Sequence, residues 1–316
     1  MTEVFKTIKP GLLTTIQDLG RSGYQQYGIT TSGAMDPFSL KVANLLVGNS
    51  RNEAALEITL MGPELEIMTD RVIAFTGADL SPEIDGRPVP MWTAFRVKKG
   101  MTLTFGRPKT GSRTYLAFSG GINVPEVLGS RSTDMKAEIG GINGRELQKG
   151  DRLIGQAFWG RSLPGKSRSL HPSLIPSYES PVVCRVIPGP DDEMFTEKSK
   201  ATFYNTEYTV NRQSDRMGVH LDGAFLAHTE SADILSDAIL PGTIQVPGAG
   251  KPIMLMADRQ TTGGYPRLAT VISTDLMYAG QLSAGQRVCF QPVSVTEAQN
   301  LRKKQEYCLT TIARSV

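Results

Sequence analysis

The stretch PIMLMADRQTTGGYPRLATVIS (Pro252–Ser273) has two short apolar runs on either side of a strongly polar segment. Both apolar runs are typical of buried strands. A hairpin between two such strands usually needs only about two to five loop residues. The polar segment DRQTTGGYP (Asp258–Pro266) is longer and contains an acid, a base, an amide, two hydroxyls and two adjacent glycines. We therefore expect a β fold in which this loop has a task beyond turning the chain.

Short strand-like runs recur along the whole chain. They are rich in β-branched or aromatic residues, and most are bounded by Gly or Pro, which is typical of strands. They are Val72–Gly77, Thr102–Phe105, Thr114–Gly121, Pro181–Ile187, Thr243–Pro247 and Arg287–Phe290. This pattern predicts a mainly β chain of the barrel or sandwich type. A weak echo among residues 95–105, 145–154 and 280–290 fits either ordinary β-turn-β units or a barrel that occurs twice.

Only a few helices are expected. The best candidate covers Asp36–Asn49, where Asp36 is a natural N-cap, Pro37 occupies the first helical position and Gly48 provides a stop. A second helix is expected from Asp192 to about Phe203, and a third from Ser294 to about Thr310. In the third, Ser294 and Glu297 have the spacing of a capping box.

Composition excludes several classes of protein. The chain has 316 residues, 40% of them hydrophobic and 21% charged, and a formal net charge of +3. Because the basic residues are scattered, no nucleic-acid partner is expected. The N-terminus lacks the layout of a signal peptide, and no apolar run approaches the roughly 18–20 residues that span a bilayer. We expect a cytoplasmic protein without a membrane partner.

The sequence suggests two domains joined by a Ser- and Pro-rich linker. The expected boundaries are 1–159 for the N-terminal domain, 160–181 for the linker, 182–293 for the C-terminal domain and 294–316 for a helical tail. The linker contains GRSLPGKS (Gly160–Ser167), which matches the phosphate-binding pattern GxxxxGK[ST]. That motif requires a helix after the Lys-Ser, and Pro172 and Pro176 leave little room for one. We expect a connection rather than a nucleotide site.

Cysteines and histidines give no specific signal. The three cysteines are isolated, so each is expected to be a plain thiol. The three histidines lack the HxxxH or HExxH spacing of metal sites. No metal site is expected.

The first polar cluster lies between Thr14 and Asp36. Gln17, Asp18 and Arg21 stand close together before a glycine-broken loop that enters the first helix. One interpretation is that Asp18 and Arg21 form a structural pair that braces the loop. The alternative is that Gly33 and the helix start at Asp36 approach a ligand, because small residues let the backbone come near.

The second polar cluster follows a strand and runs from Leu128 to Arg145. Within it, Thr133, Asp134 and Lys136 provide a hydroxyl, a carboxylate and an amine on a short arc. Such a set suits binding of an anion or a carbonyl oxygen. A solvated loop is the alternative.

The last two polar clusters belong to the C-terminal half. Arg216, Gln245, Asp258 and Gln260 lie in or next to strand-like runs, where side chains are held firmly. If the strand continues past Asp258, then Asp258 and Gln260 face the same side. The rest of the opening loop adds the candidate binding residues Thr261, Gly263, Gly264 and Tyr265.

These segments together resemble a known family. The shared motifs are QDLGRxGY (17–24), SGAMDxxSxxxANLLVGN (32–49), FTGAD (75–79), YLAFSGGI (115–122), LGSRSTD (128–134), DRMG (215–218), GTIQVP (242–247) and DRQTTGGYP (258–266). They resemble the KipA family, also called the C subunit of 5-oxoprolinase or allophanate hydrolase subunit 2, and part of the carboxyltransferase region of urea carboxylase. The resemblance runs from about Ile8 to about Phe290. It departs at His220, where Arg is more usual, and in the basic linker.

The resemblance implies two cyclophilin-like β-barrels and a role in a complex. The implied partners are a KipI-like protein and a LamB/YcsF-like protein, which with this chain open 5-oxo-L-proline to L-glutamate by means of ATP and Mg²⁺. By itself the chain is expected to be inactive, and it carries no biotinylation motif. The candidate catalytic residues are Asp18, Arg21, Thr133, Asp134, Lys136, Asp258 and Gln260. The candidate substrate or interface residues are Gln17, Gly33, Asp36, Arg216, Gln245, Thr261, Gly263, Gly264 and Tyr265.

Two alternatives remain open on the sequence alone. The family name also implies a regulatory role, in which the chain binds a KipI-like inhibitor of a histidine kinase. Alanine changes at Asp258 and Gln260 would then leave that binding intact. The other alternative is a carboxyltransferase subunit of a urea carboxylase type of system, whose biotinyl carrier would be supplied by another chain.

Overall fold

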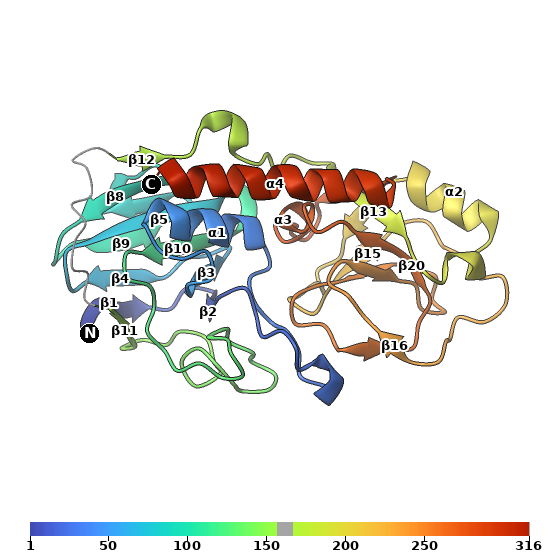
Figure 1. The fold of residues 1–316 in the computed structure, drawn as a ribbon, viewed down its shortest axis with the longest axis horizontal. Coiled ribbons are helices and arrows are strands. Elements are labelled where there is room, and N and C mark those ends of the chain that lie inside the picture. The colour runs from blue at the N-terminus through green and yellow to red at the C-terminus, as the bar shows by residue number, and fades with distance from the viewer. Residues whose placement is uncertain (157–166, 316) are drawn as a thin grey trace. The chain divides into compact units, whose positions relative to one another are not determined.

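Residues 1–156 and 167–315 are described by a computed structural model (Figure 1). They divide into two units. Unit 1 comprises residues 1–21, 32–177 and 307–316, and unit 2 comprises residues 22–31 and 178–306, within the described ranges. The segment Gly160–Lys166, most of the phosphate-loop-like sequence, lies outside the described residues, and the predicted linker stays a prediction. The residues that follow it, Arg168–Ser169, form a strand (β12), not the helix that a phosphate loop requires.

Unit 1 is built from two six-stranded antiparallel sheets. The first has the order β11-β1-β4-β9-β6-β7, and the second has the order β12-β8-β5-β10-β3-β2. The strands are β1 Thr2–Lys9, β2 Leu13–Gln17, β3 Ala55–Thr59, β4 Glu64–Ile67, β5 Arg71–Asp79, β6 Pro82–Ile84, β7 Arg87–Pro88, β8 Thr93–Val97, β9 Thr102–Phe105, β10 Thr110–Phe118, β11 Arg152–Gly155 and β12. A short 3-10 turn, η2 (Pro172–Leu174), follows β12.

Both sheets of unit 1 contribute to one hydrophobic core. Phe5 of β1 and Leu103 of β9 belong to the first sheet, and Phe75 of β5 and Phe118 of β10 to the second; all four are fully or almost fully buried in the same cluster. The rings of Phe5 and Phe118 meet edge to face, with centroids 5.6 Å apart. Burial of these faces supplies the main stabilisation of the unit.

Helix α1 (Pro37–Leu46) packs on β5 and β10 of unit 1. The Asp36 carboxylate accepts from the Ser39 amide at 2.9 Å and from the Ser39 hydroxyl at 2.6 Å, so it caps the helix as the sequence predicts. Eight of the ten helical residues are buried. The helix is therefore part of the core, and it fixes the position of the loop that precedes it.

Unit 2 contains a closed barrel with the strand order β13-β20-β17-β18-β15-β14-β21. Strands β13 and β21 pair in parallel, whereas the other neighbours pair antiparallel. The strands are β13 Val182–Pro188, β14 Tyr208–Val210, β15 Gly218–Asp222, β17 Thr243–Gln245, β18 Ile253–Leu255, β20 Arg267–Val271 and β21 Arg287–Pro292. A separate ladder joins β16 (Asp237–Ala238) to β19 (Thr262–Gly263).

The barrel explains the length of the Asp258–Pro266 segment. Strands β18 and β20 are not neighbours, because β17 lies between them and pairs with both. The connection from β18 to β20 therefore passes one strand, and on the way it pairs through β19 with β16. The two apolar runs therefore do not form a hairpin with each other, and the polar segment is the connection that crosses β17.

The remaining helices are short, apart from the last. Residues 25–27 form η1 (Gln25–Tyr27) and residues 192–194 form η3 (Asp192–Met194), followed by α2 (Glu197–Asn205) and α3 (Leu276–Ala279). Helix α4 covers Val295–Ser315. Its predicted capping box forms: the Ser294 amide donates to Glu297 Oε2 at 2.9 Å, and the Glu297 amide donates to Ser294 Oγ at 3.2 Å.

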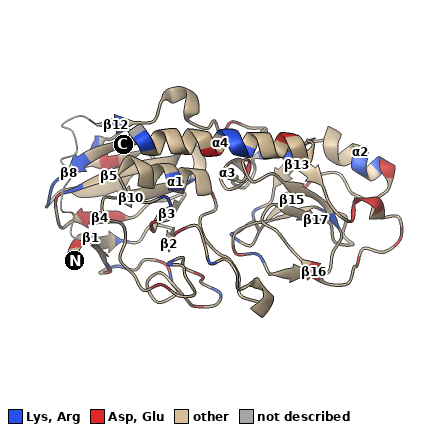
Figure 2. Ribbon diagram, viewed as in Figure 1, with Lys and Arg blue, Asp and Glu red and all other residues tan. Residues whose placement is uncertain are grey.

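The predicted fold class is confirmed: the chain is mainly β with a few helices, unit 2 contains a closed barrel, and unit 1 contains two sheets that share one core. Along the ribbon of both units, basic and acidic residues are interspersed (Figure 2). None of the helices in the described ranges combines the length and the apolar character needed to cross a membrane. All three cysteines are free, and burial raises the pKa of the Cys184 thiol, which keeps it protonated.

Candidate functional site

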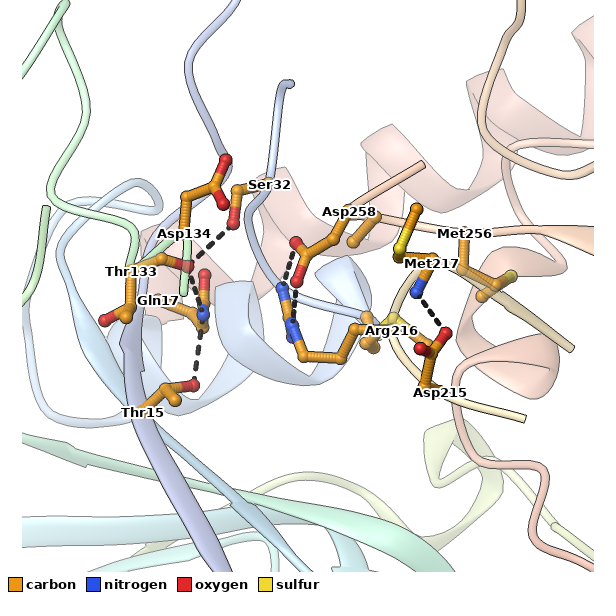
Figure 3. Close-up of polar contacts among 12 residues, drawn as sticks. Thr15, Gln17, Ser32, Thr133, Asp134, Asp215, Arg216, Met217, Met256 and Asp258 are labelled. Atoms are coloured by element: carbon orange, nitrogen blue, oxygen red, sulfur yellow. Dashed lines mark hydrogen bonds and ion pairs between the residues drawn. The ribbon is translucent and has the colours of Figure 1, made fainter. Parts of the chain in front are cut away.

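The polar residues of unit 1 gather where β2 ends. Gln17 is fully buried, and its Nε2 donates to Thr15 Oγ1 at 3.0 Å and to the Thr133 carbonyl at 3.1 Å. Thr133 in turn donates from its amide and its hydroxyl to the Ile16 carbonyl. Figure 3 shows these side chains at the junction of β2 and the 128–134 loop. The structure therefore brings Gln17 of the first polar cluster into contact with Thr133 of the second.

Asp18 ties the same loop to β2. Its carboxylate accepts from the hydroxyls of Ser130 and Ser132 at 2.7 and 2.6 Å, and from the amides of Arg131 and Gly20 at 2.6 and 2.8 Å. These contacts use the accepting capacity of both carboxylate oxygens. The Asp18 side chain is only 3% exposed and acts as a positioning group.

Arg21 binds the loop from the other side. It is fully buried, and its Nη2 donates to the Ser132 carbonyl at 2.5 Å. Asp18 and Arg21 thus both hold the Ser130–Asp134 segment. Gly140 packs against this contact, since a Cβ at that position would lie 2.0 Å from the Ser132 carbonyl oxygen.

The loop before α1 closes the cluster in unit 1. Ser32 has a positive φ of 50°, and its hydroxyl donates to the Thr133 carbonyl at 2.8 Å. A Cβ on Gly33, whose φ is +93°, would lie 2.9 Å from the Gly20 amide nitrogen. Gly33 therefore permits close packing of two backbone segments, and Asp36 is a buried helix cap.

The rest of the second cluster is partly exposed. Asp134 is 1% exposed, and its Oδ1 accepts from the amides of Lys136 and Ala137 at 3.1 and 3.0 Å. The Lys136 side chain is exposed. The structure therefore holds Asp134 firmly by a turn and leaves Lys136 in solvent.

In unit 2, Arg216 and Asp258 form a bidentate ion pair (Figure 3). Arg216 Nε donates to Asp258 Oδ2 at 2.7 Å, and Nη2 donates to Oδ1 at 2.9 Å. The side chains are only 6% and 12% exposed. Arg216 precedes β15 and Asp258 follows β18, which are neighbouring strands, so strand pairing brings the two groups together. Such a pair in a sheltered place is strong and directional.

One turn and one main-chain hydrogen bond support this pair. Asp215 Oδ1 accepts from the amides of Met217 and Gly218 at 2.7 and 3.1 Å, which shapes the DRMG turn. After the end of β18, the Asp258 amide donates to the Arg216 carbonyl at 2.9 Å. The side-chain pair is thus backed by a main-chain contact between the same two residues.

Gln245 supports the glycines of the segment Asp258–Pro266, hereafter the signature loop. Its Nε2 donates to the Tyr265 carbonyl at 2.7 Å. A Cβ on Gly263 would lie 2.4 Å from Ile239 Cδ1 and 2.9 Å from Gln245 Nε2. Gly263 therefore serves packing inside the loop, whereas Gly264 is half-buried and Tyr265 is exposed.

Gln260 does not join Asp258. Strand β18 ends at Leu255, so the strand alternation that would place both on one side does not extend to residue 260. Gln260 is exposed, while Asp258 is mostly buried against Arg216. Thr261 is half-buried, and its carbonyl accepts from the Ile239 amide at 3.1 Å.

Sequence reasoning missed two buried groups. Arg259 is 4% exposed in unit 2, although it lies between two residues that were predicted. In unit 1, the Tyr115 hydroxyl donates to Glu57 Oε2 at 2.6 Å and accepts from the Asp36 amide at 2.8 Å. Burial, together with the charges of Glu57 and Asp36, raises the pKa of Tyr115 well above its usual value. The only sequence feature that pointed to them was their place in the family motifs DRQTTGGYP, for Arg259, and YLAFSGGI, for Tyr115.

The described residues include no group of three His, Cys, Asp or Glu side chains arranged to hold a metal ion. Chemically, the site residues of each unit provide hydrogen-bond donors in fixed positions. Unit 2 adds the carboxylate of Asp258, which is paired with the guanidinium of Arg216. That set suits recognition of a polar, uncharged or anionic group.

Comparison with known proteins agrees with the motifs. The sequence model of the carboxyltransferase domain, subdomain A and B, matches residues 27–292. The chain is 42% identical to the C subunit of 5-oxoprolinase from Escherichia coli (strain K12) over 306 residues, 96% of both chains. It is 40% identical to the C subunit of 5-oxoprolinase from Haemophilus influenzae, covering 96% of this chain and 95% of that protein.

Solved structures agree on the fold. The urea carboxylase of Kluyveromyces lactis matches with a TM-score of 0.91 and 32% identity, over 99% of this chain. The match covers 29% of the urea carboxylase chain, so this chain corresponds to one region of that larger protein. On the family model and the two full-length relatives together, the chain belongs to the carboxyltransferase subdomain A and B family, as a member of its KipA branch, the branch of the 5-oxoprolinase C subunits.

Proposed function

We propose that this chain is the C subunit of an ATP-dependent 5-oxoprolinase, which converts 5-oxo-L-proline to L-glutamate. The observation that carries the proposal is the 42% and 40% identity to two proteins of that name, each covered over at least 95% of its length. The proposed partners are a KipI-like protein and a LamB/YcsF-like protein. The proposed place of action is the cytoplasm, where ATP is available.

The reaction needs activation of a stable amide. A lactam carbonyl is stabilised by resonance, so water attacks it slowly. Transfer of the γ-phosphoryl group of ATP to the lactam oxygen gives an imidate phosphate and ADP. Water then adds to the same carbon, and the C–N bond breaks as the ring nitrogen leaves and takes up a proton, which gives γ-glutamyl phosphate. A second water hydrolyses this acyl phosphate to glutamate and phosphate. The protein must therefore stabilise charge that develops on the lactam oxygen and hold the ring N–H.

The Arg216–Asp258 pair supports this role best. A guanidinium places fixed donors where negative charge develops, and a carboxylate accepts a hydrogen bond from a ring N–H. We propose that Asp258 holds the ring N–H and that Arg216 fixes the carboxylate while facing the lactam oxygen. In unit 1, Thr133 and Asp134 are proposed to contact substrate or partner, whereas Asp18, Arg21 and Asp36 position the loops.

Nucleotide binding is proposed at the level of the complex. The described residues include no group of three His, Cys, Asp or Glu side chains that could hold a metal ion without the help of phosphate oxygens. We therefore assign no catalytic step of this chain to the metal. The proposal places Mg·ATP on the KipI-like partner or between that partner and this chain, and it makes the isolated chain inactive.

The proposal is tested by assembling the three proteins and comparing two substrates. The KipI-like protein, the LamB/YcsF-like protein and this chain are mixed, and ADP release is measured with 5-oxoproline, with urea and with neither. The proposed function predicts ADP release that depends on 5-oxoproline and not on urea. ADP release driven by urea alone would overturn it.

A second candidate, a carboxyltransferase role, is favoured by one observation: the TM-score of 0.91 with a urea carboxylase. That activity requires a biotinyl carrier on another chain. Adding avidin to a reconstituted mixture that also contains a biotinylated carrier protein separates the two functions, since avidin blocks biotin-dependent transfer. Unchanged 5-oxoproline turnover with avidin supports the oxoprolinase, and complete inhibition supports the carboxyltransferase.

A further inference from the structure

Arg259 stands in the middle of the signature loop of unit 2 and is buried. Its Nε donates to the Ile239 carbonyl at 3.2 Å, and its Nη1 donates to Thr31 Oγ1 and to the Met256 carbonyl, both at 3.2 Å. All three acceptors are uncharged. In the part of the chain that the structure describes, no carboxylate lies within 4 Å of this guanidinium.

The charge of Arg259 is nevertheless retained. Burial lowers the pKa of Arg259 to about 10, so the guanidinium stays protonated at neutral pH. The neighbouring carboxylate, that of Asp258, already gives both of its oxygens to Arg216. The charge of Asp258 raises the pKa of Arg259 but does not outweigh burial, so the positive charge of Arg259 is compensated only in part. An anion that binds there would remove much of the remaining cost of burying that charge.

One nitrogen of Arg259 is available for such an anion. The three contacts engage Nε and Nη1, and Nη2 has no hydrogen-bond partner among the described residues. Nη2 is not fully enclosed, although the side chain is only 4% exposed. The three contacts therefore fix the guanidinium and leave Nη2 as an accessible donor.

We propose that Arg259 binds the carboxylate of the substrate through Nη2, beside the Arg216–Asp258 pair that takes the lactam ring. The inference rests on the proposed function and adds the group that recognises the acid end of the molecule. A single free positive charge matches a monoanionic carboxylate, whereas a triphosphate carries several negative charges and would need several cations or a metal. Arg259 is thus a specificity residue, which distinguishes cyclic amides with a neighbouring carboxylate from neutral ones.

The proposal is tested by combining substitutions in the chain with a change in the substrate. The complex of all three proteins is assembled with wild-type chain, Arg259→Met, Arg259→Lys or the control Arg212→Met, since Arg212 is an exposed arginine of the same unit. Each complex is assayed with 5-oxoproline and with 5-oxoprolinamide, which has the same ring and a neutral amide in place of the carboxylate. ATP is varied separately.

Arg259→Met is expected to lower kcat/KM for 5-oxoproline by about ten- to hundredfold, the usual effect of losing one hydrogen bond to a charged group. The kcat/KM of Arg259→Met for 5-oxoprolinamide and its KM for ATP should stay as in the wild type. Arg259→Lys should recover part of the lost kcat/KM for 5-oxoproline. The control Arg212→Met should behave as wild type. Equal losses for both substrates would overturn the inference in favour of a structural arginine. A raised KM for ATP would overturn it in favour of a phosphate ligand. Absence of 5-oxoproline turnover with the wild-type complex would instead overturn the proposed function itself.

Discussion

At the scale of single residues, the Arg216–Asp258 pair of unit 2 makes the chain sensitive to substitution and makes the site rigid. Taking Arg216 and Asp258 out of water is costly, and their two hydrogen bonds offset that cost only while both partners are present. Removal of one partner leaves a mostly buried charge. The pair is therefore sensitive to substitution, and its rigidity is the property that a substrate-holding group needs.

Asp258→Asn should therefore destabilise the chain. The amide keeps the shape but not the charge, and Arg216, whose side chain is 6% exposed, loses its bidentate partner. We expect the free energy of unfolding to fall by about 3 kcal/mol, at the lower end for a broken buried pair. Urea denaturation measures it. The exposed Asp233→Asn serves as the matched control and should change stability by less than about 0.5 kcal/mol. A loss no larger than the control's would show that the pair is energetically unimportant.

Asp151 of unit 1 gives a pH dependence with a definite sign. Burial raises its pKa, but hydrogen bonds from Arg145 at 2.7 and 2.9 Å and from the Gln148 amide outweigh burial, so the pKa is lowered. A lowered pKa in the folded state means stabilisation that is present above the unfolded value of about 3.9 and is lost as pH falls through the folded value.

Asp151→Asn should consequently cost about 1 kcal/mol of unfolding free energy at pH 7 and progressively less below about pH 4. Chemical denaturation at several pH values measures this difference. A destabilisation by the variant that stays constant down to about pH 2, well below the unfolded pKa, would contradict the assigned ion pair.

At the scale of elements, the loops that carry the site residues are fixed by backbone packing. In unit 1, the 128–134 loop is held by Asp18, Arg21 and Gln17, and Gly140 fits between Ser132 and Arg21. In unit 2, the signature loop crosses β17 and pairs through β19. The positions of site residues on these loops therefore depend on glycines elsewhere in the sequence, as the 128–134 loop depends on Gly140.

Gly140→Ala should be far more damaging than Gly129→Ala. Both glycines have positive φ, +71° and +74°, so both substitutions carry the same conformational strain of about 1 kcal/mol. A Cβ at Gly140 would additionally lie 2.0 Å from the Ser132 carbonyl oxygen, whereas a Cβ at Gly129 meets no atom within 4 Å. Thermal unfolding of the two variants measures the difference, and equal melting temperatures would contradict the tight packing at Gly140.

Local signals in the sequence predicted local structure well. Asp36–Pro37 fixed the start of α1, and Ser294 with Glu297 predicted the capping box of α4, because each depends on residues within one turn. The order of the barrel strands depends on contacts distant in sequence, so no local pattern indicated that β17 lies between β18 and β20. The same limit explains why the predicted orientation of Gln260 was wrong: it assumed a strand through residue 260, and β18 ends at Leu255. It also explains why the burial of Arg259 was missed, since no local pattern indicated it.

At the scale of the whole molecule, the family and the fold class agree with the sequence motifs. The chain contains two units with separate polar clusters, and the relatives that match it over their full length carry the name of one component of an enzyme. A component that supplies part of a site is expected to be indispensable to turnover yet inactive by itself.

The most direct test of the proposed function is the ratio of glutamate formed to ADP released by the KipI-like and LamB/YcsF-like partners, with and without this chain. With the chain present, we predict 5-oxoproline-dependent formation of glutamate and ADP in equal amounts, and with the chain omitted we predict neither. Asp258→Asn in the complete mixture should lower both products together. Equal glutamate formation with and without the chain, or ADP release with no glutamate in the complete wild-type mixture, would contradict the proposed function.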